Sequence, residues 1–375
     1  MFGFVDKLIK KNRIFANIKL TVMKVLFDHQ IFNFKYGGAP KYFAMLLKHM
    51  PADCWETTCL YSSNEYVRSE HLFKTYKYLF RGQARIVDAV NKVYTNNILR
   101  MRDYDVFHQT NFGTYCFQSI GNKPMVTTFH DINLSTYDPH PEIVRLQEKS
   151  LKRANAVVCV SENTKNDMLR LFDIDEKKVK VIYHGIEIPD LSLLSDQRVC
   201  NSKYILYVGR RSAYKNFARF IEAFSLLHKV YADVKVVCTS SPFNADEVQF
   251  FSQLGISDCM INISADESTM LRLYRDALFF IFPSLYEGFG MPILEAWSCS
   301  CPVVLSKASC FPEIAGDAGL YFDAEDVEDI YRKMVAVIED PSLRERLIDK
   351  GKKRIVQFSW DKCAADHIEL YNSLV

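Results

Sequence analysis

The sequence predicts an α/β protein made of two doubly wound, Rossmann-like domains. Its 375 residues are enough for two domains that each bury a core of their own. Short apolar runs, of the kind found in buried parallel strands, alternate along the chain with segments that have the apolar spacing of helices. The order strand, glycine loop, helix also occurs twice, in residues 23–47 and in residues 277–297. These observations favour parallel sheets with helices between the strands.

The domain boundaries are predicted from changes in periodicity. We expect an N-terminal domain at residues 23–190, a linker at 191–202 that is rich in Ser, Leu and Asp, and a C-terminal domain at 203–358. Residues 359–375 are expected to form a last helix. Residues 1–22 form a short basic amphipathic extension, which is a flexible tail, a helix lying on a membrane surface, or an upstream start, and we favour the tail.

The composition is that of an ordinary soluble protein, with 49% hydrophobic and 25% charged residues. No apolar run approaches the roughly 20 residues that span a bilayer, and no secretory signal is visible. The 11 cysteines are scattered without a Cys-x-x-Cys pair. We therefore expect a cytoplasmic protein with reduced thiols, and neither a disulfide framework nor a metal site.

Charge is distributed unevenly along the chain. Residues 1–190 carry 27 Lys and Arg against 20 Asp and Glu, a balance of +7, whereas residues 191–375 carry 20 against 25, a balance of −5. The basic half could face an anionic acceptor or the anionic inner face of a membrane. It could equally be a soluble domain that is merely basic.

The second glycine loop is the most informative stretch of the sequence. An apolar run at 277–282 predicts a buried strand, and Gly288 and Gly290, which lack a Cβ, let the backbone approach a ligand closely. Pro292 fits the first position of the helix that follows. Unpaired N–H groups and the positive end of the helix dipole gather there, so the loop predicts an anion-binding site.

Two carboxylates, Glu287 and Glu295, frame this loop with seven residues between them. Carboxylates bind phosphate poorly but accept hydrogen bonds from sugar hydroxyls. A ligand with hydroxyls at both ends and a phosphate between them, such as a nucleotide sugar, fits this layout. We expect Glu287, Gly288, Phe289, Gly290, Met291 and Glu295 to bind it. The alternative is two solvated glutamates around a tight turn.

This stretch resembles the signature of the retaining glycosyltransferases of family four, which have the GT-B fold. The resemblance rests on the residues from Pro283 to Ala296, and it continues through Cys301-Pro302-Val303-Val304 and through residues 311–319. Ser300 and Trp297 depart from the pattern, where the family usually has glycine and often methionine. The resemblance implies two domains that face each other across a cleft, with the last helix crossing back to the first domain.

A pair of cations lies between a second strand and its helix. Arg210 follows the apolar run at 204–208, and Lys215 precedes Asn216, a residue that favours helix N-caps. Two cations and the N–H groups of a helix start suit a diphosphate, and the resembling family binds the donor diphosphate with an Arg and a Lys here. The alternative is surface charge near a helix cap.

The N-terminal half contributes fewer candidates. Gly37 and Gly38 precede a helix, where the family has a glycine loop that contacts the acceptor or the donor phosphate, although an ordinary helix-entry turn explains them equally well. His130 ends a predicted strand and matches the family's histidine that faces the donor sugar. We expect Asp131 to cap the next segment and His108 to be structural.

Other functional classes find less support. Residues 61–102 interleave aromatic and basic residues, but no nucleic-acid-binding motif accompanies them, so no nucleic-acid partner is expected. A Walker-type lysine loop and a Gly-x-Gly-x-x-Gly sequence are both absent, which counts against a nucleoside triphosphatase and a dinucleotide dehydrogenase.

The resemblance therefore implies a retaining glycosyltransferase. It would use a nucleotide sugar as co-substrate, with no cofactor or metal, and a glycan or lipid-linked acceptor. The proposed catalytic residues are His130, Arg210, Lys215 and Glu287. A GT-B subunit that binds sugar nucleotides without turnover, or serves as a scaffold, is the alternative from another class. Among enzymes, an epimerase or a phosphorylase of the same fold remains open.

Overall fold

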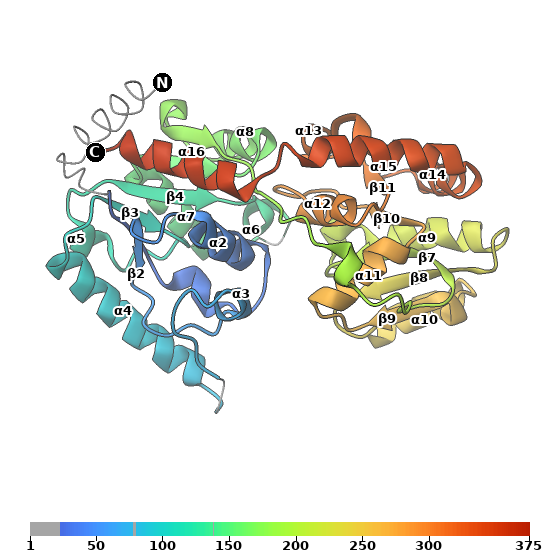
Figure 1. The fold of residues 1–375 in the computed structure, drawn as a ribbon, viewed down its shortest axis with the longest axis horizontal. Coiled ribbons are helices and arrows are strands. Elements are labelled where there is room, and N and C mark those ends of the chain that lie inside the picture. The colour runs from blue at the N-terminus through green and yellow to red at the C-terminus, as the bar shows by residue number, and fades with distance from the viewer. Residues whose placement is uncertain (1–22, 78–79, 138) are drawn as a thin grey trace, which may run out of the picture.

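The computed structural model describes residues 23–77, 80–137 and 139–375, which form two α/β units (Figure 1). Each unit is built on a six-stranded sheet, and every pairing between the strands is parallel. This confirms the predicted fold class of two doubly wound units. The expectations for residues 1–22 lie outside the described residues.

The first sheet has the strand order β2-β1-β3-β4-β5-β6. Its strands are β1 (Val25–Phe27), β2 (Trp55–Thr57), β3 (Val106–Gln109), β4 (Met125–Phe129), β5 (Ala156–Cys159) and β6 (Val179–Val181). The helices of this half are α2 (Gly38–His49), α3 (Glu65–Ser69), α4 (Gln83–Met101), α5 (Phe117–Ile120), α6 (Asn133–Thr136), α7 (Pro141–Arg153) and α8 (Glu162–Leu171), with 3-10 turns η2 (Gln30–Asn33), η3 (Glu176–Lys178) and η4 (Leu191–Leu193).

Different helices cover the two faces of the first sheet, because successive strand residues point to opposite faces. Val25 and Phe27 pack on one face with α2 and with the last helix, α16 (Trp360–Asn372). Leu26 and Phe107 pack on the other face with residues of α4 and α5. Strands that are buried on both faces are rich in apolar residues, which is why they stand out in the sequence.

The second sheet has the strand order β12-β11-β10-β7-β8-β9. Its strands are β7 (Lys203–Val208), β8 (Val234–Thr239), β9 (Met260–Ile263), β10 (Phe279–Phe282), β11 (Val303–Ser306) and β12 (Leu320–Phe322). The helices are α9 (Phe217–His228), α10 (Ala245–Gln253), α11 (Glu267–Asp276), α12 (Met291–Ser298), α13 (Phe311–Ala315), α14 (Val327–Glu339) and α15 (Pro341–Ile355), with 3-10 turns η5 (Ala213–Lys215), η6 (Ser257–Cys259) and η7 (Gly316–Ala318).

The second sheet is also buried on both faces. Leu206 and Phe280 belong to a core shared with α11, α12 and α13. Ile205 and Ile281 point the other way, into a core shared with α9, α10 and α14. The same alternation of core sides therefore builds both halves of the molecule.

Each sheet contains one point where the strand order reverses. In the first sheet this point lies between the paired strands β1 and β3, and in the second it lies between β7 and β10. Loops that leave the carboxyl ends of two such strands run in opposite directions, so ligands of doubly wound sheets bind there. The loops after β7 and β10 are those in which the sequence predicts the cations and the glycines.

The last helix joins the two units. Ser359 caps α16 by accepting a hydrogen bond from the N–H of Lys362, and α16 lies along the first unit while α15 lies along the second (Figure 1). Tyr371 and Trp360 of α16 are buried in the core of the first unit. The predicted crossing of the C-terminal helix to the first domain is confirmed.

Two details of the predicted helix starts are wrong. Asn216 precedes α9, but it adopts a left-handed conformation with φ of 56°, and its side-chain amide donates to the carbonyl of Ala324 at 2.7 Å instead of capping the helix. Helix α12 begins at Met291, so Pro292 occupies the second position rather than the first. By contrast, Ser161 caps α8 through its side chain, which accepts from the N–H of Thr164 at 3.0 Å.

Candidate active site

The reversal point of the second sheet brings together two predicted site residues that are far apart in the sequence. Lys215, at the end of η5, places its Nζ 2.5 Å from Oε1 of Glu287 in the loop after β10. Their side chains are only 17% and 13% exposed, so the two charges face each other with little water between them. The loops after β7 and β10 are also joined by a backbone bond from the N–H of Leu285 to the carbonyl of Tyr214.

Arg210 lies in the same loop as Lys215 but is exposed. In the part of the chain that the structure describes, its guanidinium has no ion-pair or hydrogen-bond partner. The adjacent Arg211 behaves differently, because it pairs with Glu247 at 2.6 Å and stacks on Phe243. Of the two consecutive arginines, Arg210 is therefore the one that remains available to a ligand.

Gly288 is the point where the glycine loop meets the first unit. Its carbonyl accepts hydrogen bonds from the hydroxyls of Ser161 at 2.7 Å and Thr164 at 2.9 Å. A Cβ built on Gly288 would lie 1.9 Å from the carbonyl oxygen of His130. Glycine is therefore required here by close approach to the end of β4, and any side chain would push the two units apart.

Gly290 and Phe289 set the direction in which α12 leaves the loop. Gly290 has a φ of 90°, a conformation that residues with a Cβ rarely adopt, and α12 has no side-chain cap at its N-terminus. The ring of Phe289 stacks on His184 at 4.4 Å between centroids. The start of α12 is thus fixed by packing, while its first N–H groups have no side-chain acceptor.

Two residues of the segment after β11 make contacts near the site: Ser309 bonds the glycine loop, and Glu313 bonds the start of α8. The Ser309 hydroxyl donates to the carbonyl of Glu287 at 2.6 Å, and its Oγ lies 3.2 Å from the N–H of the same residue. The carboxylate of Glu313 accepts from the N–H groups of Glu162 and Asn163 at 2.7 and 2.9 Å, at the start of α8. A residue of the second unit thus caps a helix of the first.

Glu295 makes a second contact between the units. Its Oε1 lies 2.8 Å from Nζ of Lys41 in α2, and Oε2 accepts from the hydroxyl of Tyr274 at 3.3 Å. The nearby Glu295 carboxylate raises the pKa of Lys41. Gly37 precedes α2 with a φ of 143°, and its carbonyl accepts from the N–H of Lys41, so the Gly37–Gly38 turn places this lysine opposite α12.

His130 ends β4, as predicted, and its side chain lies among aromatic rings. The ring centroids of Tyr42 and Phe43 are 5.1 and 5.9 Å away, and the buried Nε2 has no hydrogen-bond partner in the described structure. Burial lowers the pKa of His130 to about 4, so the ring is neutral at neutral pH. Its partnerless nitrogen can therefore donate to or accept from a hydroxyl without carrying charge.

Asp131 is linked electrostatically to the second unit. Burial and the nearby Glu287 carboxylate raise its pKa, whereas Lys215 acts in the opposite direction. Its Oδ1 accepts from the N–H of Asn133 at 3.0 Å in the turn before α6, but the N-cap residue of α6 is Ile132, and Asp131 is not the predicted cap. His108 is structural, bonded to the hydroxyls of Tyr371 and Thr128 at 2.6 and 2.9 Å.

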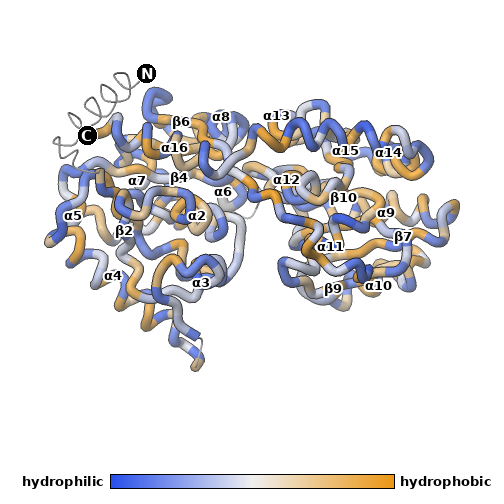
Figure 2. Tube along the Cα trace, viewed as in Figure 1, coloured by the Kyte–Doolittle hydropathy of each residue, from blue (hydrophilic) through white to orange (hydrophobic). Residues whose placement is uncertain are grey.

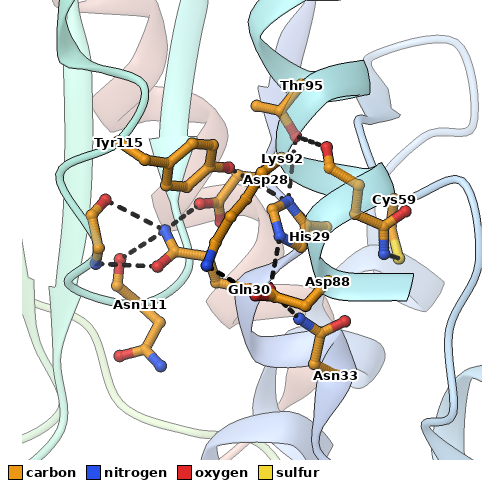
Figure 3. A network of polar contacts seen from close by, with 12 residues as sticks. Asp28, His29, Gln30, Asn33, Cys59, Asp88, Lys92, Thr95, Asn111 and Tyr115 are labelled. Carbon is orange, nitrogen blue, oxygen red and sulfur yellow. Dashed lines mark hydrogen bonds and ion pairs between the residues drawn. The ribbon is translucent and has the colours of Figure 1, made fainter. Parts of the chain in front are cut away.

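The reversal point of the first sheet holds a different polar cluster, drawn in Figure 3. Asp28 follows β1 and accepts from the N–H of Thr110 at 2.8 Å, from the Thr110 hydroxyl and from the amide of Gln30. The His29 ring contacts Thr95 at 3.0 Å through Nδ1 and Asp88 at 3.3 Å through Nε2. Burial raises the pKa of Asp28 and lowers that of His29.

Among the described residues, no group of three or more His, Cys, Asp or Glu side chains could hold a metal ion. Within the same residues, no helix is both long enough and apolar enough to cross a membrane.

The sequence reasoning missed Lys41, Ser309 and Glu313. Lys41 could have been found from the sequence, because it lies in the first turn of a predicted helix after a glycine pair. A lysine at such a position is a candidate partner for a carboxylate of the other unit, here Glu295. Ser309 and Glu313 carried none, because their partners are backbone groups that only the folded chain brings near.

Comparison with known proteins gives a consistent picture. Residues 196–354 match the model of a family described as glycosyl transferases group 1, and residues 36–188 match that of glycosyltransferase family 4. The O-antigen chain mannosyltransferase B of Escherichia coli is 32% identical over 316 residues, which cover 78% of this chain and 82% of the relative. An MMP α-(1→4)-mannosyltransferase of Mycolicibacterium hassiacum is 26% identical over 302 residues, 74% of this chain and 72% of that relative.

Among solved structures, Alr3699/HepE of Anabaena, crystallised with UDP and glucose, superimposes with a TM-score of 0.76. The match covers 94% of this chain and 100% of that one at 20% sequence identity, so it shows a shared fold.

Proposed function

The chain belongs to family 4 of the glycosyltransferases, and we propose that it transfers a sugar from a nucleotide-sugar donor to a hydroxyl acceptor with retention at the anomeric carbon. The observation that carries the proposal is the reversal point between β7 and β10. At this point the Lys215–Glu287 ion pair, Arg210, which has no partner among the described residues, and the start of α12, which has no side-chain cap, lie beside the end of β4.

The diphosphate of the donor is assigned to the cations and the start of α12. Transfer leaves a nucleoside diphosphate as leaving group, so negative charge must be stabilised as the bond to the sugar breaks. Arg210 has no protein partner among the described residues, and Lys215 has one, Glu287. The N–H groups at the start of α12 and the positive end of its dipole favour the same anion.

The two glutamates are assigned to hydroxyls. Glu287 lies beside Lys215 and near the end of β4, which supports its assignment to the sugar that is transferred. Glu295, about one turn into α12, is assigned to the ribose. In the structure each carboxylate has a lysine partner, so a bound donor would replace or share these contacts.

The first unit supplies the other side of the site. His130 is neutral and has an unpartnered Nε2, which suits a hydrogen bond to a sugar hydroxyl. The Gly37–Gly38 turn and Lys41 approach α12 from the same unit. The acceptor is proposed to be a glycan or a lipid-linked glycan, in line with the O-antigen synthesis named for the Escherichia coli relative. No metal takes part in this proposal.

The decisive experiment measures binding of UDP, GDP and ADP by calorimetry to the wild type and to Arg210→Ala and Lys215→Ala. Each variant should lose about 1.5–3 kcal/mol of affinity for the nucleotide that binds, because each removes a charge-assisted hydrogen bond. Lys352→Ala removes an exposed lysine of α15 and serves as the matched control. Near-normal affinity in both site variants would defeat the assignment.

Lys215→Ala also leaves Glu287 without its counter-ion, and this effect must be separated from loss of the ligand contact. The double variant Lys215→Ala/Glu287→Gln removes the uncompensated charge. If it recovers stability but not nucleotide affinity, Lys215 acts on the ligand. Turnover with a nucleotide sugar that binds separates an enzyme from a binding subunit.

A further inference from the structure

Along part of helix α4, polar residues face the core and apolar residues face outward. The residues that face the core, Asn91, Thr95 and Leu99, are buried although two of them are polar. On the opposite side Ile86, Val90 and Val93 are 56%, 43% and 64% exposed, and Met101 at the helix end is 83% exposed. A helix on the surface of a soluble protein normally points its apolar residues inward. The outer side of α4 is therefore built to contact something other than water.

The exposed apolar residues form one continuous strip. Ile86, Val90 and Val93 are separated by four and three residues, the spacing that places side chains on one side of a helix. Leu60 and Tyr94 extend the strip beside Val90 and Val93, where the surface has a shallow hollow of about 410 Å³. Figure 1 places α4 at the outer edge of the first unit, away from the second unit, and Figure 2 shows apolar segments recurring along it.

The surroundings of the strip are strongly basic. Residues 74–102 contain seven Lys and Arg and a single acidic residue, Asp88, which gives +6 in a chain whose total is +2. Asp88 is already paired with Lys92 at 2.6 Å. Arg81, Arg85 and Arg100 are exposed and have no ion pair with any described residue.

We propose that the outer side of α4 docks on the surface of an anionic lipid bilayer. An apolar strip flanked by arginines on a helix that cannot span a membrane is the pattern of a helix lying in the bilayer interface, with apolar side chains inserted and cations at the headgroups. Nucleic acid is a poorer match, because it offers phosphate but no apolar phase for Ile86 and Val93. The docking does not depend on the transfer reaction, although it would bring the first unit to a lipid-linked acceptor.

The test is co-sedimentation of the full chain with vesicles of phosphatidylcholine alone and with vesicles that also contain phosphatidylglycerol. The wild type should partition at least about tenfold more strongly to the anionic vesicles. Arg85→Glu/Arg100→Glu should lower that partition by about tenfold or more. Lys352→Glu/Lys353→Glu, the matched charge reversal on α15, should leave it unchanged.

The apolar strip is tested separately. Val90→Ser/Val93→Ser should weaken partition by about fivefold, because less apolar surface is inserted. Val230→Ser/Val248→Ser is the matched control, since these valines are 63% and 51% exposed on the second unit. A Trp at position 93, from Val93→Trp, should shift its emission to the blue on adding anionic vesicles, whereas Val248→Trp should not.

Three outcomes would overturn the proposal: no partition of the wild type to anionic vesicles, equal partition of α4 variants and controls, or a dimer in sedimentation velocity that Val90→Ser/Val93→Ser dissociates. The last would mean that a second copy covers the strip. Transfer to a soluble acceptor is measured in the same variants and should be unchanged, so a failed docking proposal and a failed transferase proposal give different results.

Discussion

The two reversal points of the molecule are built alike and filled differently. Between β1 and β3, the carboxylate of Asp28 is surrounded by donors from Thr110 and Gln30 and is fully buried. Between β7 and β10, Arg210 is exposed and has no partner among the residues that the structure describes, and Lys215 forms its ion pair with Glu287. In the first cluster the polar groups form hydrogen bonds with one another. In the second cluster charged groups remain that a ligand could bind.

The difference teaches how to separate structural from ligand-binding polar clusters. Polar residues at strand ends are expected wherever doubly wound sheets bind ligands, but they bind only if their hydrogen-bonding capacity is not already used. Substitutions in the first cluster should therefore cost stability, and those in the second should cost affinity and rate.

The largest effect is expected for Asp28→Ala. It leaves the N–H of Thr110 without its acceptor in a buried site, and it removes one acceptor of the Gln30 amide, which also donates to the carbonyl of Asn111. The free energy of unfolding should therefore fall by about 3–5 kcal/mol. Urea denaturation measures it, with Asp103→Ala as control, because Asp103 is fully exposed and its loss should cost under about 1 kcal/mol. If Asp28→Ala is as stable as the wild type and loses only transfer activity, the first cluster has a functional role, and the distinction between the two clusters is wrong.

Acid should weaken the packing of α16 on the first unit. Burial lowers the pKa of His367 in α16 to about 4, while the unfolded chain protonates near 6.5. As the pH falls, the unfolded chain is protonated at His367 before the folded chain is. The contribution of this group to the free energy of unfolding is therefore complete above about pH 6.5 and is lost as the pH falls towards 4. The loss amounts to at most about 3 kcal/mol.

Denaturant unfolding at several pH values checks the acid effect. His367 Nε2 accepts from the hydroxyl of Tyr42 at 2.9 Å, with Nδ1 bonded to the carbonyl of Cys363, so protonation disturbs the contact between α16 and α2. His367→Gln should flatten the pH dependence. An unchanged slope in that variant would contradict the assignment.

The glutamates should differ in a smaller, kinetic effect. Glu287→Gln acts beside the transferred sugar, where charge develops during reaction, and should lower kcat by about ten- to hundredfold. Glu295→Gln weakens a ribose contact and should mainly raise the donor KM. Nucleoside diphosphate should still bind normally to Glu287→Gln. Loss of that binding in Glu287→Gln, but not in Glu295→Gln, would reverse the two roles.

The smallest effect is expected from chelation. If protein cations neutralise the leaving group, EDTA should leave turnover unchanged. Activity that EDTA abolishes and only a divalent cation restores would show that Arg210 and Lys215 do not suffice.

The fold class and much of the second reversal point could be predicted from local sequence patterns. Buried parallel strands are apolar on both faces, so runs such as residues 277–282 are visible without a structure. Gly288 and Gly290 could also be identified from the sequence. Glycine is favoured where the backbone approaches another group closely, as at Gly288, and where φ is positive, as at Gly290. The crossing of α16 followed from the family resemblance.

The pairing of polar groups could not be predicted, because it depends on segments that lie far apart in the sequence. Lys215 and Glu287 are 72 residues apart, and Lys41 and Glu295 are 254 apart. Their pairing depends on strand order and on the junction of the units, which no local pattern encodes. The predicted capping role of Asn216 was wrong for the same reason, because its side-chain amide donates to the carbonyl of Ala324, which is distant in the sequence. The local sequence shows which side chains can form hydrogen bonds and ion pairs. Their partners depend on how distant segments pack against one another.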